Sequence, residues 1–566
     1  MAKSKKGNQQ QVKHAVVTDL STSTLNKKFN FTLEERICLA LLVCLIILIY
    51  VIRSKFFNIP FERDEGIYSY FGKLILEGKT PYKDFYEIKF PGLFYFYGFM
   101  VFIFGETIKG VHAGFTYLNI ATIILIYNTS RLLFSPTAGL ISAITFAFLS
   151  LNPSLSGFTV QAEHGVAFFI SLGVLFYALA KKHNKWHWYG LMGLAMGAAF
   201  MVKTTGVLLC LWGGLIILLD FLLGNPKKIK ELFINLFAYS IGGISIVAIL
   251  FFIIFLKGAF GEMIFFTYEL PKEYISNVPF EEGVKYFTYT KDAIVQNYKF
   301  FWIHSILAIL LCWFKAIDIK LKLFGITLLL FSFFTIVPGF YFYGHYFIQL
   351  VPGFSIVAGL TVYSIISISK EYLKEKSNLL PYFYLLVFSF FTYTHVIALK
   401  SYYLKPNYDK ILRAVYGTNP FPEDMEIAKF INANSKPQDN IVLIGSEPQI
   451  YFYTNKKCPS RHAYFTALVN NIPQHKAWQQ EFIKDVEKAQ PRYFVFFNHP
   501  ISLLVQPGAD TYVFDWANKY ITANYQLVGL VDMVNGPRSI YKWNQEALNY
   551  KPVSQMVIYV FERKHS

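Results

Sequence analysis

Two adjacent carboxylates and a lysine follow the first hydrophobic run of the chain. Asp64 and Glu65 stand side by side, and Lys89 comes just before a Pro-Gly turn, in the segments Glu62-Arg63-Asp64-Glu65-Gly66 and Tyr86-Glu87-Ile88-Lys89-Phe90-Pro91-Gly92. A carboxylate can take a proton from an acceptor, and a cation can stabilise a phosphate that leaves. Because the segment begins where an apolar run ends, we expect both groups at the rim of a membrane.

Asp64 and Glu65 are the candidate bases. Adjacent carboxylates can raise one another's pKa, so either could act. The alternative for Asp64 is an ordinary surface ion pair with Arg63, worth roughly 0–1 kcal/mol. For Lys89, the alternative is a side chain that extends to the membrane interface. Nearby Tyr86 and Glu87 could contact a substrate or be structural.

A second polar group, Gln161-Ala162-Glu163-His164, opens a later apolar run. An acid and a histidine at a membrane edge cost free energy, so residues of these types are usually found there because they have a function. Gln161, Glu163 and His164 could therefore bind the acceptor, a metal or the sugar. The alternative is a short helix cap that points into the headgroups.

Two further candidates stand between apolar runs. Lys203 needs an anion if it is buried, and a lipid phosphate would suit; otherwise it is an interfacial lysine. His345 could contact a phosphate, and Tyr343 and Tyr346 could stack on a sugar ring or hydrogen-bond to it. Aromatic belts occur in any membrane protein, so the assignment of this segment to a binding site depends on His345.

Composition indicates a polytopic membrane protein. Hydrophobic residues make up 54% of the 566 positions and charged residues only 16%, against about a quarter in soluble domains. The net charge of +17 is spread over the amino-terminal tail, short loops and the carboxyl-terminal part, without an arginine-rich face for nucleic acid. The five cysteines show no zinc-type spacing.

Apolar runs predict about eleven membrane-spanning helices within a transmembrane domain at 37–399, after a basic tail at 1–36. The run Gly92–Gly105 is shorter and predicts a helix lying at the outer surface. The first span is expected to be an uncleaved anchor. The eleven spans are expected near residues 37–51, 110–127, 137–151, 162–180, 187–201, 205–223, 234–256, 299–314, 321–337, 346–368 and 379–398.

Lysine and arginine in alternate loops predict the orientation. Basic short loops stay in the cytoplasm, and here they share one side with the amino-terminal tail. The long loops 52–109 and 257–298 and the tail from 399 then face outward, and the second loop could close over a donor as a lid. Short loops and this overall build favour a bacterial inner membrane, with the active site on the periplasmic or outer side.

The tail, 400–566, alternates helix and strand patterns and predicts a small soluble α/β domain. Helices are expected at Glu423–Ala433 and Glu481–Lys488. Strands are expected at Ile441–Gly445, Tyr493–Phe497, Tyr525–Val531 and Met556–Phe561. Without a glycine-rich phosphate loop, this domain is interpreted as a lid or acceptor platform.

The first outer loop resembles that of the GT-C-type polytopic glycosyltransferases that use dolichyl- or polyprenyl-phosphate sugars. These include protein O-mannosyltransferases and the aminoarabinose transferase of lipid A. The family's loop reads Asp-Glu, a Tyr-rich helix, a short acidic patch and Lys-Pro-Pro; here Phe90 replaces the first proline. The resemblance covers roughly 37–370 and extends to the turn Met201-Val202-Lys203-Thr204-Thr205-Gly206.

The resemblance implies an all-α GT-C-like membrane domain and an inverting sugar transfer from a polyisoprenyl-phosphate donor. Asp64 would be the base, and Lys89, Lys203 and His345 would hold the donor phosphate. The acceptor could be a glycan, a lipid or a protein. No cofactor is certain; some relatives use a divalent cation, for which Asp64 and Glu163 leave room.

Two rival functions remain. A transporter or flippase for a lipid-linked glycan would carry polar residues near the middle of its spans, whereas the charges here lie at the ends of spans. An O-antigen ligase or polymerase would be expected to carry basic residues in a large late outer loop. A non-enzymatic scaffold would explain none of the outer-loop motifs.

Overall fold

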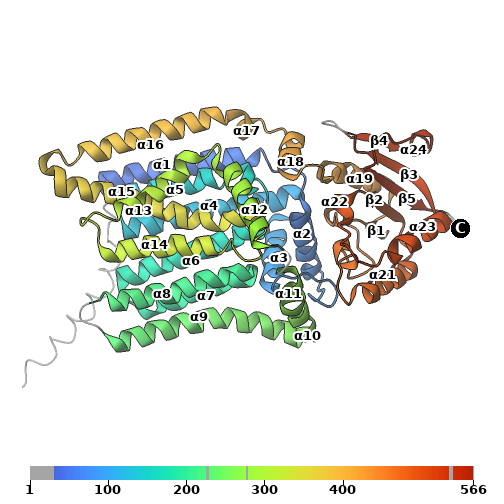
Figure 1. Ribbon diagram of the computed structural model, residues 1–566, viewed down its shortest axis with the longest axis horizontal. Helices are drawn as coiled ribbons and strands as arrows, with labels where there is room; N and C mark the ends of the chain where they lie inside the picture. Colours follow the sequence, from blue (N-terminus) through green and yellow to red (C-terminus); the bar gives the residue numbers. More distant parts are fainter. Residues whose placement is uncertain (1–30, 225–227, 276–277, 535–538, 565–566) are drawn as a thin grey trace, which may run out of the picture.

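The protein has two parts, a long helical bundle and a carboxyl-terminal α/β part at one end of it (Figure 1). The computed structural model describes residues 31–224, 228–275, 278–534 and 539–564. The predicted basic tail therefore lies outside the described residues up to residue 30. Buried apolar side chains form one continuous cluster that runs from Cys38 in the first helix to Val560 in the last strand.

Each of the eleven predicted spans corresponds to a helix of the bundle. Seven described helices are long and apolar enough to cross a membrane by length and composition, or eight if one bent pair counts as a span. The other four predicted spans are shorter helices. The eleven are α1 (Leu33–Ser54), α4 (Ile108–Leu133), α5 (Pro136–Leu149), α6 (Ala162–His183), α7 (Trp186–Val202), α8 (Val207–Leu222), α9 (Ile229–Leu256), α13 (Lys299–Leu311), α14 (Ile319–Phe334), α15 (Val351–Leu373) and α16 (Leu379–Ala398).

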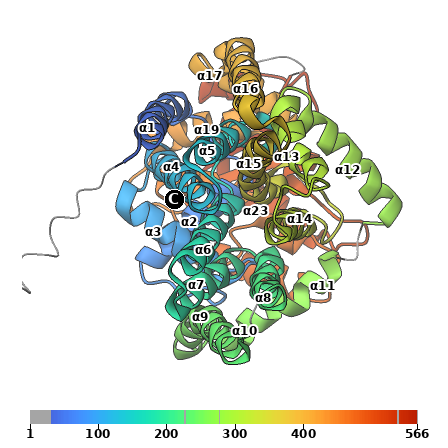
Figure 2. The ribbon, with the colours of Figure 1, turned by 90° about the vertical axis from the view of Figure 1, so that its left-hand side faces the viewer.

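The bundle helices run side by side along the long axis, and Figure 2 shows them end-on with α16 and α9 at opposite edges. Only 6% of the most apolar window of α16 and 11% of that of α9 are buried inside the protein. For α15 the buried share is 78%. Apolar helix faces left uncovered by protein are those that lipid can cover, so α15 is central and α9 and α16 are peripheral.

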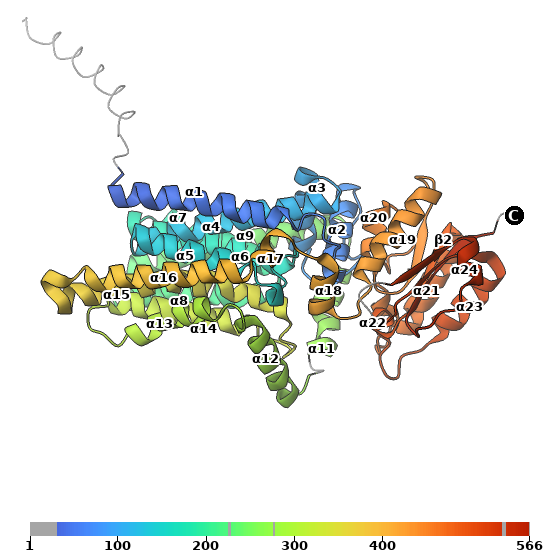
Figure 3. The same cartoon turned by 90° about the horizontal axis from the view of Figure 1, so that it is seen from above.

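Short helices occupy the end of the bundle that faces the α/β part (Figure 3). The predicted fourteen-residue helix is present as α3. The segment 257–298, expected as a loop, is largely helical, and α12 meets α13 at a bend of 108°. The elements are α2 (Arg63–Leu76), α3 (Pro91–Phe104), η1 (Pro153–Leu155), η2 (Thr204–Gly206), α10 (Phe260–Ile264), η3 (Phe265–Glu269), α11 (Leu270–Ile275), α12 (Phe280–Val295), η4 (Gly344–Leu350) and, at the opposite end, η5 (Lys374–Lys376).

The α/β part contains a five-stranded sheet in the order β1-β2-β5-β3-β4. β1 and β2 are parallel, and the other neighbours are antiparallel. The four predicted strands are β1 (Ile441–Ile444), β2 (Tyr493–Asn498), β3 (Tyr525–Asp532) and β5 (Val557–Arg563); β4 (Ile540–Trp543) was not predicted. The helices are α17 (Lys400–Leu404), α18 (Tyr408–Tyr416), α19 (Phe421–Asn434), α20 (Gln449–Thr454), η6 (Phe465–Leu468), α21 (His475–Ala489), α22 (Pro500–Leu503), α23 (Tyr512–Asn524) and α24 (Gln545–Asn549).

Helix α2 is the main contact between the two parts. A Cβ atom added at Gly66 would lie 2.5 Å from the Cβ of Gln449, so the two backbones approach as closely as a glycine allows. The phenol of Tyr453 also accepts a hydrogen bond from the backbone of Phe61 at 2.6 Å. The start of α2, where the candidate carboxylates lie, is thus held against the α/β part.

Candidate active site

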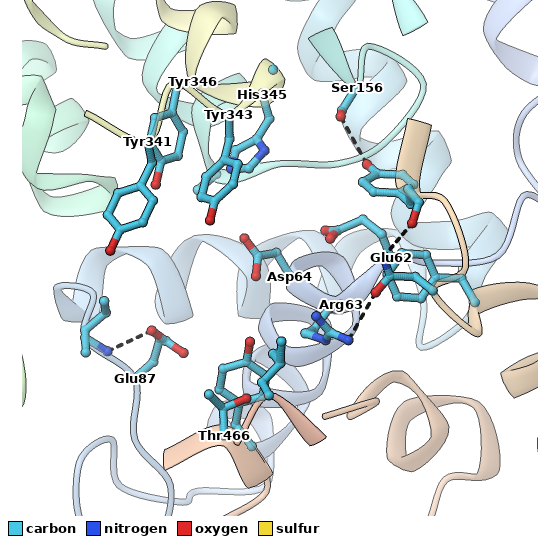
Figure 4. A pocket seen from close by; sticks show the side chains of 18 of the residues that line it. Glu62, Arg63, Asp64, Glu87, Ser156, Tyr341, Tyr343, His345, Tyr346 and Thr466 are labelled. Atoms are coloured by element: carbon cyan, nitrogen blue, oxygen red, sulfur yellow. Dashed lines mark hydrogen bonds between the residues drawn. The ribbon is translucent and has the colours of Figure 1, made fainter. Parts of the chain in front are cut away.

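A cavity of about 1480 Å³ lies between the α/β part and the end of the bundle that faces it. Its wall on the bundle side comes from the start of α2, the loop 86–89, the start of α6, Lys203 and the segment 341–346. The opposite wall comes from residues 414–421, 464–472 and 498–507. Segments far apart in the sequence therefore enclose one space, and many of the predicted site residues line it (Figure 4).

Asp64 points into this cavity, whereas Glu65 does not line it. The Asp64 carboxylate is half-buried, and no described residue donates a hydrogen bond to it. Glu65 is fully buried and accepts hydrogen bonds from the backbone amides of Val160, at 2.6 Å, and Glu62, at 2.8 Å. His112 Nε2 lies 3.2 Å from the same carboxylate. The structure thus separates the two predicted bases, and only Asp64 is free to meet a substrate.

Arg63 is not paired with Asp64. Its guanidinium makes an ion pair of 2.9 Å with Glu447 of the α/β part and donates a hydrogen bond to Ser446 O at 2.5 Å. Burial alone would lower the pKa of Arg63, but the Glu447 carboxylate holds that pKa above its ordinary value. The proposed surface ion pair is therefore wrong, and Arg63 instead ties α2 to the α/β part.

Glu62 is a third carboxylate at this helix start, and the sequence analysis did not select it. It caps α2 by accepting a hydrogen bond from the Glu65 amide at 2.8 Å, and Gln161 Nε2 donates to it at the same distance. Burial, followed by the charges of Asp64 and Glu65, raises the pKa of Glu62 well above its usual range. The capping pattern of Glu62 and Glu65 was readable from their spacing of three residues.

The Lys89 turn is brought against the end of α7. A Cβ atom at Gly92 would lie 2.5 Å from the carbonyl oxygen of Met201, so only glycine allows this approach. Pro91 occupies the first turn of α3, where its missing N–H needs no partner. As a result Lys89 and Lys203, which are more than a hundred residues apart, line the same wall of the cavity.

Lys203 and Glu163 form a buried ion pair, and the Lys203 ammonium lies 3.7 Å from the centre of the Tyr346 ring. His345 Nε2 is 3.9 Å from the same carboxylate. The predicted Glu163, Lys203, His345 and Tyr346 thus make one cluster. The Lys203 ammonium is neutralised by Glu163, whereas Lys89 forms no ion pair with any described carboxylate.

Aromatic rings continue this cluster toward the cavity opening. The Tyr343 ring stacks on His345 with 5.8 Å between centroids and an interplanar angle of 10°. Tyr341 stacks on Tyr343 at 5.5 Å, and Tyr346 meets it edge-on. The close-up shows these rings gathered on the same side of Asp64 (Figure 4). Flat faces of this kind can stack on a sugar ring.

Tyr86 and Glu87 lie on the loop that carries Lys89. Burial raises the pKa of the Glu87 carboxyl, and the nearby charge of Lys89 opposes this rise. The Tyr86 phenol is 2.6 Å from His462 Nδ1 of the α/β part, and its ring stacks on Phe266 at 4.3 Å. Tyr86 therefore lines the cavity but also joins the outer loop to the α/β part.

Gln161 and His164 do not line the main cavity. Gln161 holds Glu62, as described above. His164 is buried, contacts the Gln161 carbonyl through Nδ1 at 3.3 Å, and faces a small cavity beside Arg53 and His112. Both predicted substrate contacts are instead placed behind the wall that carries Asp64.

The predicted metal pair does not fit a cation. Within the described residues, no group of three or more His, Cys, Asp or Glu side chains is arranged to hold a metal ion. The Glu163 carboxylate is already engaged by the Lys203 ammonium. Asp64 and Glu163 therefore do not form a donor set here.

The wall supplied by the α/β part was missed in the sequence analysis. It contains Tyr416, Asn419, Tyr464, Thr466, Asn470, Asn471, His499 and Gln506. Most of these polar residues lie in loops, while Tyr416 ends α18 and Thr466 lies in η6. No pattern in the sequence links them to the segment 86–89 of the membrane part. The clustering of amide side chains at Asn470-Asn471 is the one signal that could have drawn attention.

Comparison with known proteins agrees with this geometry. Residues 89–255 match the sequence model of a family described as dolichyl-phosphate-mannose-protein mannosyltransferase. No curated protein matches the chain. The matched segment includes Lys89, Glu163 and Lys203, and it ends near the carboxyl end of α9.

Solved structures share the fold over nearly the whole chain. ArnT from Cupriavidus metallidurans, bound to undecaprenyl phosphate, superposes with a TM-score of 0.56 at 13% identity, covering 92% of this chain and 97% of that one. The apo structure of the same protein gives 0.56 at 12% identity, with the same coverage. The archaeal oligosaccharyltransferase AglB from Archaeoglobus fulgidus, in complex with an inhibitory peptide and a dolichol-phosphate, superposes with a TM-score of 0.51 at 13% identity. The superposition covers 90% of this chain and 75% of that one.

The chain has a GT-C-type fold. The resemblance predicted from the first outer loop is confirmed by the family match and by the shared architecture. The apolar helices make it a multi-pass membrane protein, as its composition indicated. The predicted order of an all-helical membrane part followed by a small α/β part is also confirmed.

Proposed function

We propose that this protein is a membrane-embedded glycosyltransferase that moves a sugar from a polyisoprenyl-phosphate donor to an acceptor on the outer face of the membrane. The observation that carries the proposal is the shared cavity. An unengaged carboxylate, Asp64, and three basic side chains, Lys89, Lys203 and His345, line a single space at the end of the bundle. The fold supports the same reaction class, because the similar ArnT and AglB structures hold undecaprenyl phosphate and dolichol-phosphate.

In the proposed reaction Asp64 accepts the proton of the attacking acceptor group. The acceptor oxygen or nitrogen then bonds to the anomeric carbon as the bond from that carbon to the phosphate oxygen breaks. Attack from the face opposite the leaving group inverts the anomeric centre. A base placed in this way contributes roughly 10²–10⁴-fold to rate.

The leaving lipid phosphate would be stabilised by the basic side chains. Lys89 is the first choice, since its ammonium is not ion-paired with a described carboxylate. Lys203 and His345 both lie beside Glu163, which positions them on the wall but neutralises the Lys203 ammonium. Glu65, buried behind Asp64, would hold the start of α2 in place and is a positioning residue.

We place this cavity on the outer side of a bacterial inner membrane. The basic last turn of α4 and the basic segments that follow α6, α13 and α15 lie at the end of the bundle opposite the α/β part (Figure 1). Short basic loops stay in the cytoplasm. The α/β part would then be an outward-facing domain at about 400–566.

The test is release of free lipid phosphate from a panel of polyisoprenyl-phosphate sugars by the purified protein in lipid, with candidate acceptors added. Asp64→Asn should lower turnover by roughly 10²-fold or more, because an amide cannot take the proton. It should leave donor binding and the unfolding temperature unchanged. The matched control is Asp515→Asn, a change at an exposed carboxylate on α23 that does not line the cavity.

Release from one donor by the wild type, lost only in Asp64→Asn, would support the proposal and identify the sugar. Full activity of Asp64→Asn would overturn the base assignment. No release from any donor with acceptors present, with or without divalent cations, would overturn the glycosyltransferase itself and favour the transporter.

A further inference from the structure

Charge is distributed unequally over the walls of the cavity. Its acidic and basic residues, apart from histidine, all belong to the bundle side: Glu62, Arg63, Asp64, Glu87, Lys89, Glu163 and Lys203. Among the described lining residues from 270 onward, none is Asp, Glu, Lys or Arg. The α/β part therefore offers an uncharged wall to whatever enters from its side.

Amide side chains are the main polar groups of this uncharged wall. No described residue hydrogen-bonds to the side chains of Asn470 and Asn471, and the Oδ1 atom of Asn470 is buried without a partner. Unpaired buried polar atoms are uncommon in native proteins, and a ligand or water usually meets them. Each of these amides can donate and accept at the same time.

Hydrogen bonds join the two loops that carry these amides. The Gln506 amide oxygen accepts a hydrogen bond from the backbone of Asn471 at 3.2 Å, and the Gln506 backbone donates to Val469 O at 3.0 Å. The Gln506 NH₂ group is left without a described partner. Asn470, Asn471 and Gln506, here called the amide cluster, thus belong to two loops that are joined to each other.

Aromatic rings lie on the same wall. Tyr416 and Tyr464 line the cavity, and the Tyr416 phenol donates to Ser156 Oγ at 3.1 Å, which fixes its ring (Figure 4). A set of amides beside flat rings matches a sugar, whose hydroxyls both donate and accept and whose ring has an apolar face.

Other acceptor classes fit this wall less well. A phosphorylated acceptor would need free cations on this wall, and Arg63, the arginine among the described lining residues, is already paired with Glu447. A peptide recognised by strand addition would need an open sheet edge in the cavity. The edge strands β1 and β4 do not contribute to its lining.

We propose that the amide cluster binds a neutral, hydroxyl-rich saccharide unit of the acceptor and presents its hydroxyl to Asp64. This inference rests on the proposed glycosyltransferase function and adds to it the chemical class of the acceptor. The α/β part would then select the acceptor, while the bundle side holds the donor phosphate.

Binding to the intact protein in lipid, loaded with undecaprenyl phosphate, tests the inference. The probes are three neutral trisaccharides (mannotriose, maltotriose and chitotriose), a diphosphorylated glucosamine disaccharide and a Ser/Thr-rich peptide, measured by saturation-transfer NMR and titration. We expect a neutral trisaccharide to bind best. The double change Asn470→Ala and Asn471→Ala should weaken it roughly tenfold or more, because each lost hydrogen bond contributes about 1 kcal/mol.

Two further variants make the result specific. Asn518→Ala removes an exposed amide on α23 outside the cavity and should leave affinity unchanged. Asn471→Leu keeps the side-chain size but removes the amide, so it should weaken saccharide binding. It serves as the test if the double variant does not fold. The inference is overturned if no neutral trisaccharide binds at millimolar concentration, if the phosphorylated disaccharide or the peptide binds more tightly, or if the cavity variants keep full affinity.

Donor hydrolysis separates this inference from the function on which it rests. Slow release of lipid phosphate to water needs the donor side only, so variants of the amide cluster should retain it. Retained hydrolysis without saccharide binding would overturn the acceptor class alone. Absence of any donor cleavage by the wild type, with acceptors present, would overturn the glycosyltransferase instead.

Discussion

At the scale of single residues, burial divides the three carboxylates at the start of α2 among different tasks. Glu65 is fully buried and hydrogen-bonded, Glu62 caps the helix, and Asp64 alone faces the cavity. The sequence identified Asp64 and Glu65 as candidate bases but could not say which side chain would remain free. That depends on Val160 and His112, which reach Glu65 from distant parts of the chain.

The raised pKa of Glu62 leads to a prediction about stability and pH. Because burial and the neighbouring carboxylates raise the pKa of Glu62 above its unfolded value, the folded state keeps this proton to higher pH than the unfolded state does. Stability is then lost as pH rises above about 4.5, toward the folded pKa. Glu62→Gln keeps the cap oxygen without the charge. It should unfold at a higher temperature than the wild type, by a margin that grows between about pH 5 and pH 8.

Thermal unfolding in lipid nanodiscs across this pH range measures the effect. Asp515→Asn, which removes an exposed charge on α23, should track the wild type at each pH. A constant difference between Glu62→Gln and the wild type would show that Glu62 does not change its protonation in this range.

At the scale of elements, long apolar runs were predictable, whereas some short elements, among them α12 and β4, were not. A span needs about twenty apolar residues, which is a strong signal, and all eleven runs correspond to helices. Helix α12 mixes Glu281, Lys285 and Asp292 with aromatic residues and was assigned to a loop. Strand β4 has only four residues, all half-buried, so no alternation marked it.

The contact of α2 with α20 gives a prediction at this scale. At Gly66 an added methyl group would lie 2.5–2.8 Å from three atoms of Gln449. Gly66→Ala should therefore push the α/β part from α2, destabilise the protein by roughly 1–3 kcal/mol and expose the junction to protease. It should also lower transfer activity, because the two walls of the cavity would separate.

The control is Gly214→Ala on α8, where nothing lies within 4 Å of the added methyl group. Alanine favours a helix over glycine, so this variant should be neutral or slightly more stable. Thermal unfolding and limited proteolysis compare the two. Equal behaviour of both variants would mean that the close approach at Gly66 is not needed to hold the α/β part.

At the scale of the whole molecule, the cavity is a product of tertiary structure that no local pattern contains. The bundle wall was foreseen because its residues follow membrane spans, where charges are expensive and therefore informative. The opposite wall consists of loop amides such as Asn471, whose residue types are ordinary for surface loops. These residues form a wall of the cavity only because the ion pair of Arg63 with Glu447 holds the α/β part over Asp64.

The orientation of the molecule is the last prediction, and it decides on which side the reaction occurs. If the basic loops face the cytoplasm, exposed positions of the α/β part must face outward. In a variant with its five cysteines replaced, Lys519→Cys on α23 should react with an impermeant maleimide on intact cells. Lys182→Cys, which is also exposed and lies in the last turn of α6, should react only after the membrane is permeabilised.

Comparing the two cysteine variants shows more than labelling of either one alone. Both lysines are exposed in the structure, so a difference in labelling reports the side of the membrane and not burial. The reverse pattern would place Asp64 and the cavity in the cytoplasm, where the donor would have to be reached from the inner leaflet. Since the cavity and the α/β part lie at the same end of the bundle, one experiment fixes the side of both (Figure 3).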